Sequence, residues 1–272
     1  MTAFYRPVLL LLLLLLASVR ALAATPCNLL LGVVPQFEQR KLLEIWQPIM
    51  QGIEDSTGCH IQLSGSENIP DFEAKFAAGQ FDIAYMNPYH AVVAHQTQGY
   101  EPVLRSTYSL QGVLVVARGS GIDNIEALQG KQVAFPSPNA LGASLLMRAE
   151  LQNLHNVRIE PRYVKTHPSV YLHVAKGLAS AGGGIQRTLD EQPDSIRERL
   201  QVIYTTRLTP AHPLVIHPRV EGAVKTRLVN ALLTLASQHP DYFAAIPMQD
   251  PIRTDFSDYQ PVADLHLEQF QD

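Results

Sequence analysis

The sequence has no excess of basic residues and few charged residues overall. It contains 21 lysines and arginines against 25 aspartates and glutamates, which gives a formal net charge of −4. A nucleic-acid-binding protein needs clustered basic side chains to displace counterions from the phosphates, so we expect no nucleic-acid partner. The apolar share of 46% is in turn too high for a disordered chain.

Cysteine is scarce, and two residues of this type are too few for a disulfide-framework miniprotein or a cysteine-rich metal domain. Six of the ten histidines form three loose pairs, but none of these pairs has the i,i+4 spacing of two zinc ligands on one helix. The pairs are His90/His95, His167/His173 and His212/His217. The sequence also lacks a Gly-x-Ser-x-Gly elbow and a His-Glu-x-x-His motif. We therefore expect no metal, no cofactor and no enzymatic activity, with an exported hydrolase as the least favoured alternative.

The first 23 residues have the pattern of a secretory signal peptide. Arg6 supplies the positive start, residues 8–17 are almost purely leucine, and Ala21-Leu22-Ala23 has small residues at the positions that a signal peptidase reads. The apolar run of about 10 residues is too short to span a hydrocarbon core of about 30 Å. We predict export with cleavage near Ala23, and an uncleaved anchor is the alternative.

The remainder alternates between strand and helix patterns, which is typical of the α/β class with mostly parallel sheets flanked by helices on both faces. Pro48, inside the first helix pattern, is expected to kink that helix or to start a second one. The tail from Pro251 has no clear period. The predicted strands cover 28–34, 60–64, 81–86, 102–107, 111–117, 131–135, 158–164, 178–182 and 200–205, and the predicted helices cover 39–56, 69–78, 88–97, 140–153, 168–176, a segment from 185, and 221–238.

So many units are better divided between two lobes than placed in one sheet. The chain is expected to cross between lobes near 106–110 and 204–210, so residues 24–107 plus 207–272 form lobe I and residues 108–206 form lobe II. Ligands of such sheets bind beyond the carboxyl ends of the strands, which here would face a cleft between the lobes.

The two cysteines each precede a predicted strand, and one helix separates the strands. In a βαβ unit the strands lie side by side and parallel, so Cys27 and Cys59 would start neighbouring strands at a similar height. We predict a Cys27–Cys59 disulfide, which export would permit. Two buried free thiols are the alternative.

Several segments resemble a known family in their order and spacing: Val33-Val34-Pro35, residues 81–89 (Phe-Asp-Ile-Ala-Tyr-Met-Asn-Pro-Tyr), residues 128–135 (Leu-Gln-Gly-Lys-Gln-Val-Ala-Phe) and Thr166-His167. They resemble the PhnD-like periplasmic solute-binding proteins of phosphate, phosphite and phosphonate ABC importers. The resemblance implies a two-lobe type II periplasmic-binding-protein fold, a small anionic ligand, an ABC permease as partner, and a monomer in the periplasm. A sensory protein of the same fold that presents its ligand to a membrane kinase is the alternative.

The sequence departs from the family pattern at two places. Residues 137–141 read Ser-Pro-Asn-Ala-Leu where the family carries a Ser-Thr-Ser run, and Ser180 stands where the family carries an acidic residue. These departures leave the identity of the ligand open.

Candidate ligand contacts follow the ends of predicted strands. Asn139 suits an N-cap, and the free N–H groups of the helix that it would begin form an anion site, although an ordinary capped helix has the same pattern. Tyr89 is otherwise a packed aromatic side chain, and His167 is otherwise a capping or surface histidine. The expected ligand contacts are Gln36, Phe37, Asn87, Tyr89, Ser137, Asn139, Ala140, Leu141, Thr166 and His167.

Overall fold

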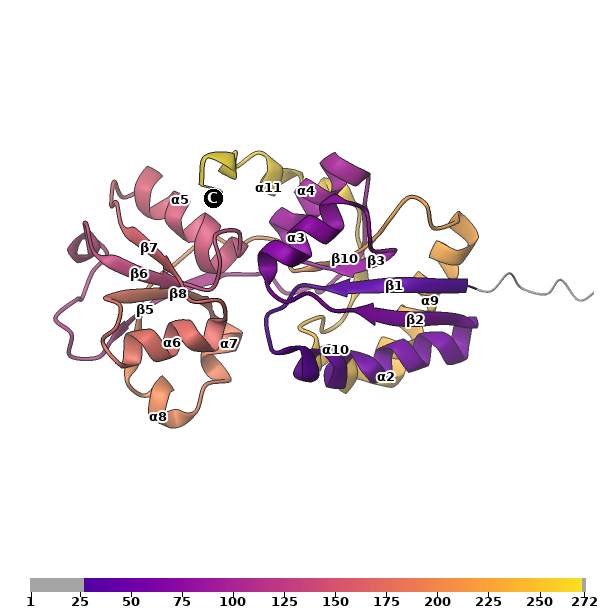
Figure 1. Ribbon diagram of the computed structural model, residues 1–272, viewed down its shortest axis with the longest axis horizontal. Helices are drawn as coiled ribbons and strands as arrows, with labels where there is room; N and C mark the ends of the chain where they lie inside the picture. Colours follow the sequence, from indigo (N-terminus) through magenta and orange to yellow (C-terminus); the bar gives the residue numbers. More distant parts are fainter. Residues whose placement is uncertain (1–26, 271–272) are drawn as a thin grey trace, which may run out of the picture.

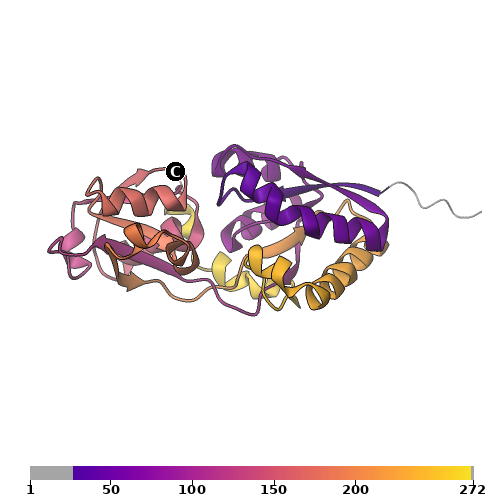
Figure 2. The same ribbon diagram turned by 90° about the horizontal axis from the view of Figure 1, so that it is seen from below.

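The computed structural model describes residues 27–270, which form an elongated molecule built around two β-sheets (Figures 1 and 2). We call the six-stranded sheet with its helices lobe I and the five-stranded sheet with its helices lobe II. The predicted signal peptide lies outside the described residues. None of the helices within 27–270 is long and apolar enough to cross a membrane.

The sheet of lobe I has the strand order β11-β4-β10-β3-β1-β2. Strands β2, β1 and β3 run parallel, and β10, β4 and β11 join them in antiparallel pairings. The strands are β1 (Cys27–Val33), β2 (Cys59–Ser64), β3 (Ile83–Tyr85), β4 (Glu101–Arg105), β10 (Pro213–Ile216) and β11 (Ile252–Arg253).

Helices cover both faces of this sheet (Figure 1). On one face lie α2 (Gln39–Thr57), α9 (Gly222–Gln238) and α10 (Pro240–Ala245), and on the other lie α3 (Ile69–Ala77) and α4 (Pro88–Gln98). The core is one connected apolar cluster rich in aromatic rings, in which the centroids of Phe72 and Phe81 are 5.4 Å apart.

The sheet of lobe II has the order β7-β6-β8-β5-β9, with parallel pairings around β6 and antiparallel pairings around β5. A π-helical turn, η2, continues into α5 on one face, and α6, α7 and α8 lie on the other (Figure 1). The elements are β5 (Gly112–Ala117), η1 (Glu126–Leu128), β6 (Gln132–Phe135), η2 (Leu141–Leu145), α5 (Leu146–Asn153), β7 (Glu160–Tyr163), α6 (His167–Ala175), β8 (Ala181–Ile185), α7 (Gln186–Asp190), α8 (Asp194–Arg197) and β9 (Leu200–Thr205).

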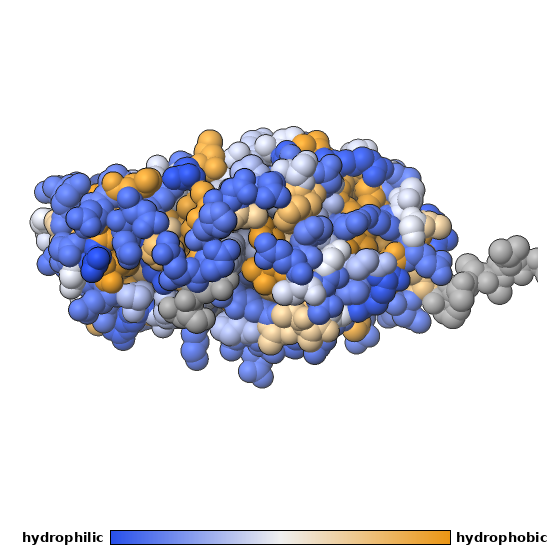
Figure 3. Space-filling view, turned by 90° about the horizontal axis from the view of Figure 1, so that it is seen from above, coloured by the Kyte–Doolittle hydropathy of each residue, from blue (hydrophilic) through white to orange (hydrophobic). Residues whose placement is uncertain are grey.

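Two antiparallel segments connect the sheets. The first joins β4 to β5, the second joins β9 to β10, and Leu110 and Thr209 form a bridge between them with N–H···O distances of 2.8 and 2.9 Å. The C-terminal segment, with η3 (Phe256–Asp258), α11 (Gln260–Ala263) and η4 (Leu267–Phe270), packs against both α4 and α5. Seen from above, the surface is mostly hydrophilic, and hydrophobic residues gather only in small patches (Figure 3).

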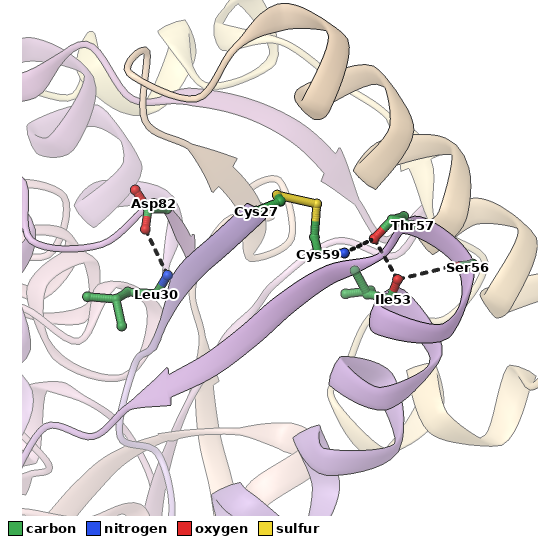
Figure 4. Close-up of a disulfide and its surroundings, with 7 residues drawn as sticks. All are labelled: Cys27, Leu30, Ile53, Ser56, Thr57, Cys59 and Asp82. Atoms are coloured by element: carbon green, nitrogen blue, oxygen red, sulfur yellow. Dashed lines mark hydrogen bonds between the residues drawn. A yellow bond between two sulfur atoms is a disulfide. The ribbon is translucent and has the colours of Figure 1, made fainter. Parts of the chain in front are cut away.

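The predicted disulfide is confirmed (Figure 4). Cys27 and Cys59 are register partners of the parallel pair β1–β2, and their Cα atoms are 4.5 Å apart. Gly58 ends α2 in the left-handed region, with φ of 71°, and turns the chain into β2. The bond lies at the amino end of β1, about 20 Å from the carboxyl end of that strand.

The α/β class is confirmed, and several element boundaries need correction. One helix runs through Pro48, so no second helix starts there. Both sheets are mixed rather than mostly parallel, because the strands next to the connecting segments run antiparallel. Strand β8 begins at Ala181 rather than at 178, and β10 was not predicted. The tail after Pro251 forms short elements.

Candidate functional site

A small cavity of about 20 Å³ lies between the lobes, and residues from both lobes line it. One ordered water needs about 10–15 Å³, so the cavity as it stands has room for one or two water-sized groups. Within residues 27–270, those that line it include no carboxylate, lysine or arginine. The lining residues are Val34, Gln36, Ile69, Asn87, Leu110, Ala140, Leu141, Gly142, Ala143, His167, Ile185 and His212.

Lobe II contributes the start of a helix to this cavity. Ala140 is the N-cap of η2, and its carbonyl accepts from the N–H groups of Ser144 and Leu145 at 2.7 and 3.2 Å. Residues 141–143 form the first turn, before the first residue whose N–H group donates within the helix. A helix has no internal acceptors for the N–H groups of its first turn. Such amides, with the positive end of the helix dipole, favour an anion.

Glycines of the neighbouring strands allow this helical turn to lie directly on the sheet. A Cβ atom on Gly183 would lie 2.0 Å from the carbonyl oxygen of Ala143, and one on Gly112 would lie 1.9 Å from that of Gly142. Real Cβ atoms do not approach oxygen atoms so closely, so only glycine fits at both positions. The position of the three amides therefore depends on Gly112 and Gly183.

Lobe I contributes neutral side chains at the strand ends. Gln36 follows β1, Asn87 follows β3, and His212 precedes the antiparallel strand β10. All three therefore lie at the same end of the sheet, where the parallel strands β1 and β3 finish. The amide Nε2 of Gln36 donates to Nε2 of His212 at 3.1 Å, which leaves the imidazole proton on Nδ1. The ring of His212 stacks on Tyr85 at 5.5 Å.

Both cavity histidines are neutral at pH 7. Burial lowers the pKa of His167 to about 4. Burial, with smaller contributions from His90, His167 and Arg187, lowers the pKa of His212 to about 3. A neutral imidazole offers one N–H donor, and a nearby anion would favour its protonation.

A polar network connects the lobes beside the cavity. Glu73 of α3 accepts from the side chain of Asn139 at 3.2 Å and lies 2.9 Å from Nε2 of His90. Asn87 caps α4 by accepting from the N–H of His90 at 2.8 Å, and its Nδ2 donates to the carbonyl of Asn139 at 3.1 Å. Asn139 is therefore an inter-lobe contact, and the prediction that it caps the helix is wrong because Ala140 takes that position.

The structure brings five of the ten predicted contacts to the cavity: Gln36, Asn87, Ala140, Leu141 and His167. The other five lie outside its lining. Tyr89 packs in the apolar cluster between α4 and α5, Phe37 lies under Lys41 with its ring centroid 3.9 Å from Nζ, Thr166 caps α6, Ser137 is buried, and Asn139 contacts Glu73.

His212 is the main cavity residue that the sequence reasoning missed. It directly precedes β10, a strand of four residues that was not predicted. The signal was the return crossing near 204–210, because a strand that re-enters the sheet antiparallel begins at the edge where the parallel strands end. Within the described part of the chain, no three His, Cys, Asp or Glu side chains are placed to hold a metal ion.

Comparisons with known proteins agree with this architecture. A family model for periplasmic substrate-binding proteins of phosphonate ABC transporters matches residues 31–259. A binding-protein component of a Pseudomonas aeruginosa ABC phosphonate transporter is 16% identical, with a TM-score of 0.79 over 89% of this chain and 86% of that one. PhnD1 from Prochlorococcus marinus, solved with methylphosphonate, is 15% identical, with a TM-score of 0.80 over 89% and 97% of the two chains.

A third solved structure has a different ligand. A Xanthomonas citri protein bound to ATP is 17% identical, with a TM-score of 0.71 over 89% of this chain and 98% of that one. At these identities the solved structures show a shared two-lobe fold, and the family model carries the assignment of the chain.

Proposed function

The chain belongs to the family of periplasmic substrate-binding proteins of phosphonate ABC transporters, and on this premise we propose that it binds a small phosphorus oxyanion in the cavity between its lobes. Membership makes the chain a transport component in the periplasm and not an enzyme. The ligand class that we propose is a phosphonate, phosphite or phosphate, which a partner permease would then import.

The observation that carries this proposal is the helix start at the cavity. Leu141, Gly142 and Ala143 line the cavity, and their N–H groups belong to the first turn of the helix that runs through η2 and α5. Backbone N–H groups and neutral side-chain donors bind oxyanions in enclosed sites without a cationic residue. The absence of a carboxylate from the lining, among residues 27–270, removes the repulsion that an anion would otherwise meet.

The remaining lining supports an anion with one apolar end. Val34, Ile69, Leu110 and Ile185 form the apolar part of the wall. A fourth oxygen of phosphate would lose its hydration there without gaining a partner, which costs free energy. A methyl group or a P–H bond has no such cost, so the wall favours phosphonate and phosphite over phosphate.

The mechanism that we propose is closure of the two lobes on the ligand. Residues 24–107 with 207–272 would form one moving lobe and residues 108–206 the other, with the paired segments around Leu110 and Thr209 as the hinge. A ligand that contacts both lobes binds the closed state more tightly and shifts the population toward it. The permease would then recognise the closed form. We also propose that the protein acts as a monomer after cleavage near Ala23.

Ligand titration tests this function. Calorimetry and thermal shift of the exported form are expected to show binding of methylphosphonate and phosphite, weaker binding of phosphate, and none of small carboxylates. A ligand at 100 times its Kd adds about 2.7 kcal/mol to the free energy of unfolding.

A matched pair of variants locates the site. His212→Ala is expected to weaken methylphosphonate binding at least about tenfold, a loss of about 1.4 kcal/mol, whereas His155→Ala, at an exposed position of lobe II, leaves it unchanged. Stabilisation by uncharged compounds alone would contradict the proposed function, and equal affinity in both variants would remove His212 from the site.

A further inference from the structure

A much larger groove adjoins the cavity on one side. Its volume is about 560 Å³, within the range of sites that hold drug-sized ligands. The groove and the cavity share four lining residues, which are Gln36, Leu110, Ile185 and His212. The two spaces are therefore adjacent, and these four residues lie between them.

The separating side chains differ between the lobes. On the side of lobe I, Gln36 and His212 form a hydrogen-bonded pair at 3.1 Å. On the other side, Leu110 and Ile185 are apolar. These residues line both spaces. An organic group attached to an anion in the cavity would therefore pass from the cavity into the groove between the polar pair and the apolar pair.

Two exposed apolar side chains line the groove. Leu208 is 63% exposed and Tyr108 is 61% exposed, and no other large hydrophobic side chain within residues 27–270 is as exposed. Both belong to the paired segments between the lobes. Large apolar groups that remain in water at the mouth of a binding cavity are typical of ligand contacts.

The charges of the groove restrict what it accepts. Its only cation among the described lining residues is Arg187, whose guanidinium donates to Glu191 at 2.9 Å and to the carbonyls of Ala244 and Ala245 at 3.1 and 2.9 Å. Asp190 also lines the groove and forms no ion pair within the described chain; its carboxylate accepts from Gln186 at 2.7 Å. A second negative charge on the ligand would meet this carboxylate without a free cation.

From these observations we propose that the groove is a second subsite, which holds an uncharged aromatic or alkyl group of a larger phosphonate or phosphate monoester. The inference rests on the proposed function, because the anionic head must occupy the cavity first. It extends the ligand class from small oxyanions to organophosphorus compounds with an apolar substituent, and it excludes substituents that carry further negative charge, such as polyphosphates.

Three probes of one head group test the subsite. Calorimetry is expected to show that phenylphosphonate binds about tenfold more tightly than methylphosphonate, a difference of about 1.4 kcal/mol. It is also expected to show that para-carboxyphenylphosphonate loses this gain, because its carboxylate lies near Asp190. Equal or weaker binding of phenylphosphonate would overturn the subsite.

Two exposed leucines provide a matched control. Leu208→Ala is expected to abolish the gain of phenylphosphonate while methylphosphonate binding stays unchanged, and Leu154→Ala, at a 58% exposed position of lobe II away from the groove, is expected to preserve the gain. Loss of the gain in both variants would overturn the assignment to this groove. If neither methylphosphonate nor phosphite binds at all, the proposed function fails instead of the subsite.

Discussion

The two lobes share an α/β plan but are stabilised differently. Lobe I has one connected apolar core with stacked aromatic rings and a disulfide. The core of lobe II is divided by its sheet, so that Leu114 and Val116 pack with α5 while Val113 and Val115 pack with α6. Lobe I therefore has a single large apolar core. Lobe II instead has two smaller apolar layers, one on each face of its sheet.

The glycines show the same difference. In lobe I the atoms nearest a Cβ added at Gly32 or Gly52 belong to the side chains of Phe81 and Leu235. In lobe II the nearest atoms at Gly112 and Gly183 are backbone carbonyl oxygens of η2, which cannot rotate away. At Gly112 and Gly183 an added side chain would therefore have to displace the backbone of η2, whereas at Gly32 and Gly52 it would first meet a side chain.

The largest expected effect concerns the disulfide of lobe I. Replacing Cys27 and Cys59 by alanine removes a cross-link that spans 32 residues, and the chain-entropy model gives a loss of about 4 kcal/mol. Urea unfolding measures this loss. Because the bond lies at the end of β1 away from the cavity, methylphosphonate affinity in the folded state should not change. A weaker ligand affinity in this variant would show that the amino end of β1 is coupled to the cavity.

The second prediction concerns Gly183 of lobe II, where a substitution is expected to lower the free energy of unfolding less than loss of the disulfide does but to abolish ligand binding. Gly183→Ala places a methyl group 2.0 Å from the Ala143 carbonyl, so the helical turn must shift. We expect a loss of about 1–3 kcal/mol in urea unfolding together with loss of methylphosphonate binding. Gly222→Ala is the matched control in lobe I, because no atom lies within 4 Å of an added Cβ there. Retained binding in Gly183→Ala would break the proposed link between glycine packing and the site.

The smallest expected effect is the contribution of His212, at the boundary between the lobes, to the pH dependence of the free energy of unfolding. The pKa of His212 is lowered to about 3 in the folded protein, whereas an unfolded histidine titrates near about 6.5. Below pH 6.5 the unfolded chain therefore binds more protons, and stability falls as the pH drops toward about 3. Between pH 7 and pH 5 this histidine should account for about 1–2 kcal/mol.

Ligand-free urea unfolding at both pH values measures this contribution. The loss of stability from pH 7 to pH 5 is expected to be smaller in His212→Gln than in the natural protein, and unchanged in His155→Gln. An identical loss in all three proteins would show that His212 is not held neutral at the boundary between the lobes.

The sequence was sufficient for the class, the disulfide and most strands, because these follow from local apolar periodicity and from the βαβ geometry around Cys27 and Cys59. It was insufficient where tertiary contacts override local preference. Strand β8 contains Gly182, Gly183 and Gly184, which are poor strand formers, and they occur there because Val170, Phe135 and Tyr171 approach their backbone closely.

The candidate site was predictable to the level of strand ends and not of side-chain directions. Gln36 and His167 follow strands and do line the cavity, as the topological rule indicates. Asn139 has a suitable residue type at a suitable position, but its side chain turns to Glu73 on the opposite lobe. No local pattern contains that contact, because it depends on how the lobes meet.

The π-helical turn also fixes the rotational phase of everything that follows it in the helix. One residue corresponds to about 100° around a helix axis, so the wider turn at 141–145 rotates α5 relative to a regular α-helix with the same start. In the observed phase, Arg148 donates to the carbonyl of Phe270, and Glu150, which is buried, accepts from Nε of Arg207 at 2.7 Å. Deleting a single residue from this turn would therefore restore regular winding and at the same time detach α5 from the C-terminal segment and from the segment that joins β9 to β10.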